Sequence, residues 1–264
     1  MFEIARFETG RRRRGGILVA VLMSALVGVT VGLYPSIARA GVDYAAYVES
    51  LPPEVRNAFG VTVGLGSIQG YLVTELYGFV WMLILGIYFA YAAASLVAGD
   101  VEDGSMELLL VNPITRTRVV VGKYLGLLPS VVFVNAVGAL AVVGFAEAVG
   151  ESVTVRALIV LHLLFVLYHA ACAAVGLVAS ASMRTQRRAQ VVSIAVLFAT
   201  YVVDSLTLDT DYEWVGALSL SRYFDPGKIL VAETIAWGDV GVLIVVTLAL
   251  VVLAAEVFER RDVG

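Results

Sequence analysis

The chain has 264 residues, of which 60% are hydrophobic and 15% are charged, and its mean hydropathy is +0.90. A soluble domain carries about 25% charged residues, so the composition excludes an ordinary soluble protein and indicates a membrane protein. The net charge of −4 is too small to indicate a nucleic-acid partner. The one cysteine, Cys172, cannot form an internal disulfide.

Residues 1–14 alternate apolar and charged side chains and end in four arginines, Arg11 to Arg14. This pattern predicts a short amphipathic helix lying in the cytoplasmic membrane interface, with its arginines near anionic lipid heads. The alternative is a disordered basic flank that only sets the topology.

Six apolar runs are long enough to cross a bilayer, which takes about 20 residues. They cover residues 17–37, 71–98, 124–149, 157–183, 190–208 and 240–258. The first run has no convincing cleavage site, so we interpret it as a retained helix and not as a signal peptide. The sequence therefore predicts an all-α membrane protein with six transmembrane helices, forming a single transmembrane domain over residues 1–264.

The basic residues predict the orientation of these helices. With the N-terminus in the cytoplasm, thirteen of the 18 basic residues fall on the cytoplasmic side and five fall outside. Cytoplasmic loops are enriched in Lys and Arg, so we expect both termini in the cytoplasm. Only Lys123 and Lys228 are lysines.

The loop between the second and third runs, residues 100–123, is a charged interruption on the cytoplasmic side. Gly104 lets the chain turn, and Asp103, Gly104 or Ser105 can cap a short helix. Glu107 then lies in its first turn, where the helix dipole favours negative charge.

Asn112 and Pro113 end this short helix, because the residue before a proline avoids the helical region. Thr115 can cap the next helix, which continues into the membrane. The apolar residues expected on one face of the short helix are Met106, Leu109 and Leu110. The element can thus plug a groove on a soluble partner; the alternative is an ordinary charged loop.

The same loop resembles the signature of ABC-2 type permeases, the membrane subunits of ATP-binding cassette transporters. That signature has an acid, Gly, Thr or Ser, Glu, a Leu pair, Pro and Arg, with a Lys some seven residues further on. The matching residues are Glu102, Asp103, Gly104, Ser105, Glu107, Leu109, Pro113, Arg116 and Lys123. Ser105 takes the position where Thr is commoner. The whole chain fits in outline, including the arginines at 184–188 and the 223–226 stretch before the last run.

The resemblance implies an ABC-2 permease fold, of the type V exporter kind, in a prokaryotic plasma membrane. Two such subunits, identical or paralogous, would work with two separate ATPase subunits, and the short helix would be the coupling helix. The nine matching residues would couple to the ATPase, which holds ATP and Mg. The chain itself has no Gly-x-x-x-x-Gly-Lys-Ser/Thr phosphate loop. We therefore expect it to bind no cofactor, metal or nucleic acid and to carry no catalytic residue.

Five polar residues lie within or near the predicted spans: Glu75, Asn135, His162, His169 and Asp204. Ionisable groups at membrane depth are candidates for a function, so one hypothesis is a polar translocation path or cation site. The alternative, which we favour, places Glu75 and Asp204 at the headgroups and has the histidines bond between helices. One pair of histidines seven residues apart is too sparse for a metal site.

Two other function classes stay open beside transport. An intramembrane enzyme is disfavoured, because neither a His-Glu-x-x-His nor a Gly-x-Ser-x-Gly motif occurs. A non-transporting scaffold or force-transmitting subunit would share the same coupling loop. The sequence does not name a cargo, although the few charges in the membrane favour export of a hydrophobic or amphipathic one.

Overall fold

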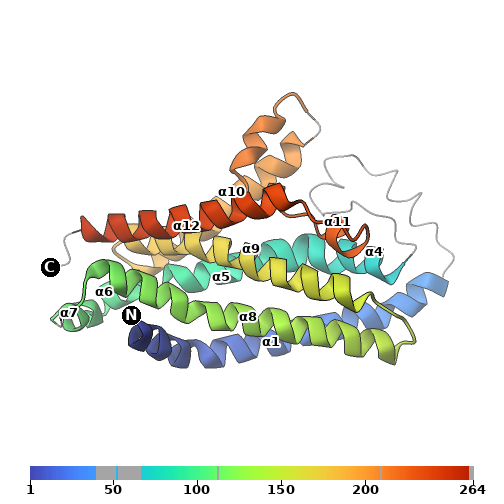
Figure 1. Ribbon diagram of the computed structural model, residues 1–264, viewed down its shortest axis with the longest axis horizontal. Coiled ribbons are helices and arrows are strands. Elements are labelled where there is room, and N and C mark those ends of the chain that lie inside the picture. The colour runs from blue at the N-terminus through green and yellow to red at the C-terminus, as the bar shows by residue number, and fades with distance from the viewer. Residues whose placement is uncertain (40–51, 53–66, 112, 209, 262–264) are drawn as a thin grey trace.

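The computed structural model describes residues 1–39, 52, 67–111, 113–208 and 210–261, and every regular element in these ranges is helical (Figure 1). Six helical stretches are long and apolar enough to cross a membrane. They are α1 (Phe2–Arg39), the stretch Ile68–Glu102, α8 (Arg116–Ala148), α9 (Val155–Ser182), α10 (Gln186–Thr207) and α12 (Trp237–Glu259). The predicted all-α class with six spans is thereby confirmed.

Helix α1 is continuous over 38 residues, so no break separates the predicted interfacial helix 1–14 from the first span. At 1.5 Å per residue it is about 57 Å long, nearly twice the hydrocarbon core of about 30 Å. Its first turns pack on α8, where a Cβ on Gly126 would lie only 2.7 Å from the Ala5 carbonyl oxygen. This packing explains why residues 1–14 stay in line with the first span.

The second span is assembled from several consecutive helical segments. They are α4 (Ile68–Leu72), the π-helix η1 (Val73–Ile84), α5 (Leu85–Ala94) and α6 (Ala98–Glu102). The Ser67 hydroxyl caps α4 by accepting the Gly70 N–H at 3.2 Å. π-Helix mostly occurs as single turns, frequently at functional sites. A π segment of 12 residues therefore makes the second span an unusual helix.

Helix α9 lies at the centre and contacts α5, α8, α10 and α12. Small residues allow the closest of these approaches, because a Cβ on Gly176 would collide with the Ala90 carbonyl of α5. Phe165 of α9 stacks on Tyr77 with ring centroids 5.7 Å apart, and Trp81 is fully buried beside it. Packed aromatic side chains therefore occupy the middle of the bundle.

The N-terminus, α7 (Ser105–Leu110) and the C-terminal end of α12 lie together at one end of the bundle, on the left in Figure 1. Helices α4 and α11 (Pro226–Leu230) lie at the other end. These ends are named the α7 end and the α11 end below; the arginine distribution predicts that the α7 end is cytoplasmic. Helix α10 diverges from the bundle with the 3₁₀ helix η2 (Glu213–Leu218) packed against it.

Candidate functional site

Helix α7 begins at a left-handed residue, as the sequence predicts. Gly104 has φ +76°, in the region that favours glycine, and occupies the N-cap position. The Ser105 N–H donates to Asp103 Oδ1 at 3.0 Å, and hydrogen bonds from Ser105 hold the pKa of this exposed carboxyl below its usual value. The next helix, α8, is capped by Thr115, whose hydroxyl accepts the Arg118 N–H at 3.3 Å. Both predicted helix starts are thus present.

The two faces of α7 differ from the sequence-based expectation. Met106 is fully buried and Leu110 packs on the core, so the expected apolar face lies against the protein itself. Leu108 and Val111 are instead 74% and 84% exposed, and Glu107 is exposed beside them. The exposed surface of α7 therefore includes Glu107, Leu108 and Val111.

The segment before α7 is anchored to the junction of α9 and α10. Glu102 Oε2 accepts the backbone N–H of Gln186, the first residue of α10, at 2.8 Å. A carboxylate is favourable at a helix N-terminus. The Ser180 hydroxyl of α9 accepts the N–H groups of Val97 and Ala98, both at 2.9 Å, where α6 begins. Movement of α6 and α7 would therefore act directly on α9 and α10.

A network of charges with a buried centre joins α1, α6 and α8. Its members are Glu8, Arg11, Arg12, Asp100 and Lys123. Lys123 Nζ bonds Asp100 Oδ2 and lies 3.3 Å from Glu8 Oε2, and these three residues are at most 3% exposed. Arg12 pairs with Glu8 at 2.7 Å, and Arg11 pairs with Asp100 at 3.0 Å. Lys123, which the motif placed at the ATPase contact, is enclosed inside the protein.

Two arginines link the C-terminal end of α12 to its neighbours. Arg116 Nη1 donates to the carbonyl oxygens of Phe258, at 3.2 Å, and Arg261, and its guanidinium lies 5.6 Å from the Phe258 ring centroid. Arg261 Nη1 donates to the Ala181 carbonyl at the end of α9, at 3.0 Å. Basic side chains stabilise the free carbonyls of a last helical turn. Of the other motif residues, Pro113 is exposed and Leu109 of α7 is half-buried.

The motif residues thus converge at the α7 end, and comparison with protein families defines the class. The model of the ABC-2 family transporter protein matches residues 3–263. The chain belongs to the ABC-2 transporter family. No curated protein matches it. As an ABC-2 permease it is a multi-pass membrane component, of a class that associates with an ABC ATPase and is not itself catalytic.

Two of the predicted polar residues, Asn135 and His169, join Trp81 in one buried network of this permease. Trp81 Nε1–H donates to Asn135 Oδ1 at 3.0 Å, which fixes the orientation of the amide because an indole N–H only donates. Asn135 Nδ2 then donates to His169 Nδ1 at 3.1 Å, so His169 Nε2 carries the proton given to the Trp81 carbonyl at 2.9 Å. The network is a closed set of bonds between helices.

His162 lies next to this network but is less completely bonded. Its Nε2 is 3.0 Å from the Tyr77 hydroxyl, whereas its Nδ1 is buried without a partner among the described residues. Its ring lies edge-on to Trp81 at 5.3 Å and close to Phe165. The two histidines are therefore in different environments although both belong to α9.

We expect His169→Leu to lower the apparent melting temperature in detergent more than His162→Leu does. Losing His169 removes a bond to the Trp81 carbonyl and leaves an Asn135 N–H unpaired, at about 1–3 kcal/mol, whereas losing His162 removes a single side-chain bond. Thermal unfolding of the two variants in one detergent measures this, with transport assayed alongside. Unchanged melting but abolished transport in His162→Leu would point to a role in translocation instead.

Glu75 and Asp204 are separate from the histidines. Glu75 is exposed on η1. Asp204 Oδ2 accepts the Ser221 hydroxyl at 2.8 Å and Oδ1 pairs with Arg222 at 3.3 Å, which holds η3 (Ser221–Tyr223) against α10. A cavity of ≈ 350 Å³ at this α11 end has Asp204 and Arg222 in its wall. The five residues therefore do not form one polar path in the described part of the chain.

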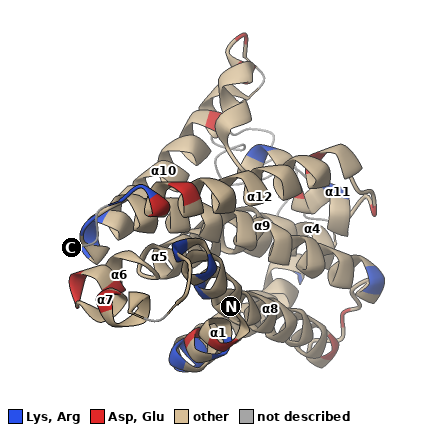
Figure 2. Cartoon of the chain, turned by 60° about the vertical axis from the view of Figure 1, so that its left-hand side comes forward, with Lys and Arg blue, Asp and Glu red and all other residues tan. Residues whose placement is uncertain are grey.

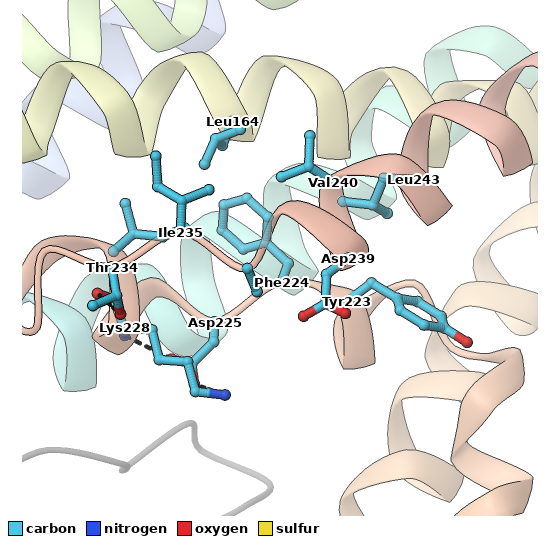
Figure 3. Close-up of a pocket in the computed structure, with 12 residues that line it drawn as sticks. Leu164, Tyr223, Phe224, Asp225, Lys228, Thr234, Ile235, Asp239, Val240 and Leu243 are labelled. Atoms are coloured by element: carbon cyan, nitrogen blue, oxygen red, sulfur yellow. Dashed lines mark hydrogen bonds and ion pairs between the residues drawn. The ribbon is translucent and has the colours of Figure 1, made fainter.

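A second pocket at the α11 end, shown in Figure 3, is too small for a cargo. Apolar side chains such as Leu164 and Val240 line it towards α9, and the Asp225–Lys228 pair, at 3.4 Å, lies on its other side. Its free volume of ≈ 20 Å³ is about that of one water molecule. The pocket is therefore a packing gap beside the start of α12.

The charged network and the exposed face of α7 contain residues that were not among the sequence-predicted site residues. They are Glu8, Arg11, Arg12, Asp100, Leu108 and Val111. An acid at Glu8 among apolar and basic residues was a usable signal, because a lone carboxylate on the inner face of a helix needs a basic partner. Leu108 and Val111 gave no signal, since the inner face of so short a helix depends on its neighbours.

Proposed function

We propose that this chain is the permease subunit of an ATP-driven exporter in a prokaryotic plasma membrane, with its α7 end in the cytoplasm. A separate ABC ATPase, which holds ATP and Mg, would dock on α7. The observation that carries the proposal is the two-sided α7: Glu107, Leu108 and Val111 face outward, while Met106 and Leu110 face the bundle. Export is the direction that the resemblance to ABC-2 permeases implies.

The contacts around α7 provide the route by which docking would move the bundle. Asp100 connects α6 to α1 and α8 through Lys123 and Arg11, and Glu102 connects it to α10. Arg116 connects the start of α8 to the end of α12. A push on α7 would therefore reach helix ends throughout the bundle and shift the balance between inward-open and outward-open states.

We further propose that two copies, or one copy and a paralogue, enclose the translocation path. In the described part of the chain, the polar groups at mid-bundle are closed off by Tyr77, Trp81 and Phe165. A path through one subunit would require breaking that aromatic core, whereas a path between subunits would leave it intact. The exposed carboxylate of Glu75 would then face such an interface.

Reconstitution with the ABC ATPase of the same gene cluster tests this function. The ATPase should co-purify with a tagged permease, and ATP hydrolysis in liposomes should rise when the cargo is added. Failure of any such ATPase to bind would contradict the permease role. Binding without stimulation by any cargo would favour a non-transporting, force-transmitting subunit.

A further inference from the structure

An apolar groove lies between α9, α10 and α12, where α10 diverges from the bundle (Figure 1). Its volume is ≈ 380 Å³, and its lining includes three hydroxyl residues but no charged one. Among the lining residues are Val178, Met183, Val192, Val196, Leu218 and Leu250. The groove extends from Val175 of α9 to Met183, just beyond the end of this helix, which is about 12 Å along the helix axis. That is close to the depth of one leaflet, half of the hydrocarbon core of about 30 Å.

Basic side chains surround the groove at the α7 end. Arg184 follows Met183 directly, and Arg188 lies one helical turn before Val192, on the same side of α10. Arg261 is held beside them by its bond to the Ala181 carbonyl. Arg184 comes three residues after Ala181, so this bond places Arg261 near Arg184. Burial, and to a smaller extent the charge of Arg184, lower the pKa of the Arg261 guanidinium.

The charges at this mouth are not neutralised within the described chain. Neither Arg184 nor Arg188 has an ion-pair partner among the residues that the structure describes. Of the nearby acids, Glu256 pairs with Arg260 and Glu259 accepts a bond from Thr117. Glu102 accepts the Gln186 N–H at the start of α10 and makes no ion pair with either arginine. Figure 2 shows the basic residues gathered where the end of α12 meets the start of α10.

We propose that this groove is a binding site for one resident anionic phospholipid of the cytoplasmic leaflet. Its phosphate would contact Arg184, Arg188 and Arg261, and one acyl chain would fill the space beside Val196 and Leu250. Charge complementarity selects the head, because arginine forms bidentate bonds with phosphate. The uncharged wall of the groove at membrane depth favours the acyl chain of the lipid. A neutral lipid would fill the groove but leave the arginines without a counterion.

Native mass spectrometry of the full permease, without its ATPase, tests the site. The protein is taken from nanodiscs of phosphatidylcholine with or without phosphatidylglycerol, and the wild type should retain one phosphatidylglycerol. Arg188→Gln should weaken its affinity about five-fold, because one phosphate contact is lost. Arg187→Gln is the matched control: it removes the same charge from the neighbouring residue, which lies about 100° further round α10 and away from the groove, and it should change nothing.

A second variant tests the acyl part of the site. Val196→Trp fills the groove at a half-exposed position and should expel the phospholipid while leaving all arginines in place. Retention of phosphatidylglycerol in this variant, or equal losses in Arg187→Gln and Arg188→Gln, would overturn the proposal. So would a disulfide between copies formed by Val196→Cys, which would show that a second subunit fills the groove.

Discussion

Leu108→Arg is expected to abolish binding of the ATPase while the permease still folds and inserts. Leu108 is 74% exposed on the outward face of α7, so it contributes little to packing in the free subunit. Burying a leucine in a partner's groove is worth about 2–3 kcal/mol, which corresponds to a loss of affinity of about 30- to 140-fold. An arginine at this position would add the cost of desolvating its charge. Co-purification and the stimulation of ATP hydrolysis measure the loss.

The matched control is Trp214→Arg, at an equally exposed apolar side chain in η2 beyond α10. It should leave ATPase binding unchanged, because η2 lies away from α7 (Figure 1). Met106 is unsuitable for this test, since its side chain is fully buried and a charge there would disrupt folding. If Leu108→Arg bound the ATPase as tightly as the control, α7 would not be the docking helix.

The positions of the spans and of α7 were predictable because their signals are local. Apolar runs of sufficient length mark membrane helices regardless of what packs on them. Gly104 and Thr115 mark helix starts by their own backbone and side-chain chemistry, and Pro113 lies just beyond the end of α7. None of these signals needs knowledge of a distant residue.

The arrangement of the site was not predictable from the sequence, because it depends on contacts between distant residues. Glu8 and Lys123 are 115 positions apart and meet only because α1 packs along α8. The same packing keeps α1 continuous, where the local pattern indicated a separate interfacial helix. Likewise, Asn135 of α8 bonds His169 of α9 because these two helices pack together, whereas Glu75 is exposed and contacts neither residue. The sequence does not show which polar groups face each other in the bundle.

Lys123→Met should destabilise the permease strongly, although it adds no bulk. Glu8 Oε2 and Asp100 Oδ2 would both lose their lysine donor in a site that is almost fully buried. Breaking a buried ion pair costs about 3–5 kcal/mol, which lowers an apparent melting temperature by about 6–20 °C for a chain of this size. Thermal unfolding in detergent measures the change.

The other lysine of the chain provides the control. Lys228 pairs with Asp225 at 3.4 Å, but its side chain is 63% exposed, so Lys228→Met should cost at most about 1 kcal/mol. A double-mutant cycle of Glu8→Gln and Lys123→Met should give a coupling energy of about 0.5–3 kcal/mol, whereas Glu8→Gln and Lys228→Met should be additive. Equal melting of the two lysine variants would show that the network does not hold α1, α6 and α8 together.

If the network also transmits force, the Lys123→Met variant, when it is kept folded in lipid, should still bind the ATPase at the intact α7 surface. Its ATP hydrolysis should then no longer respond to cargo, which separates the role of Lys123 from that of Leu108.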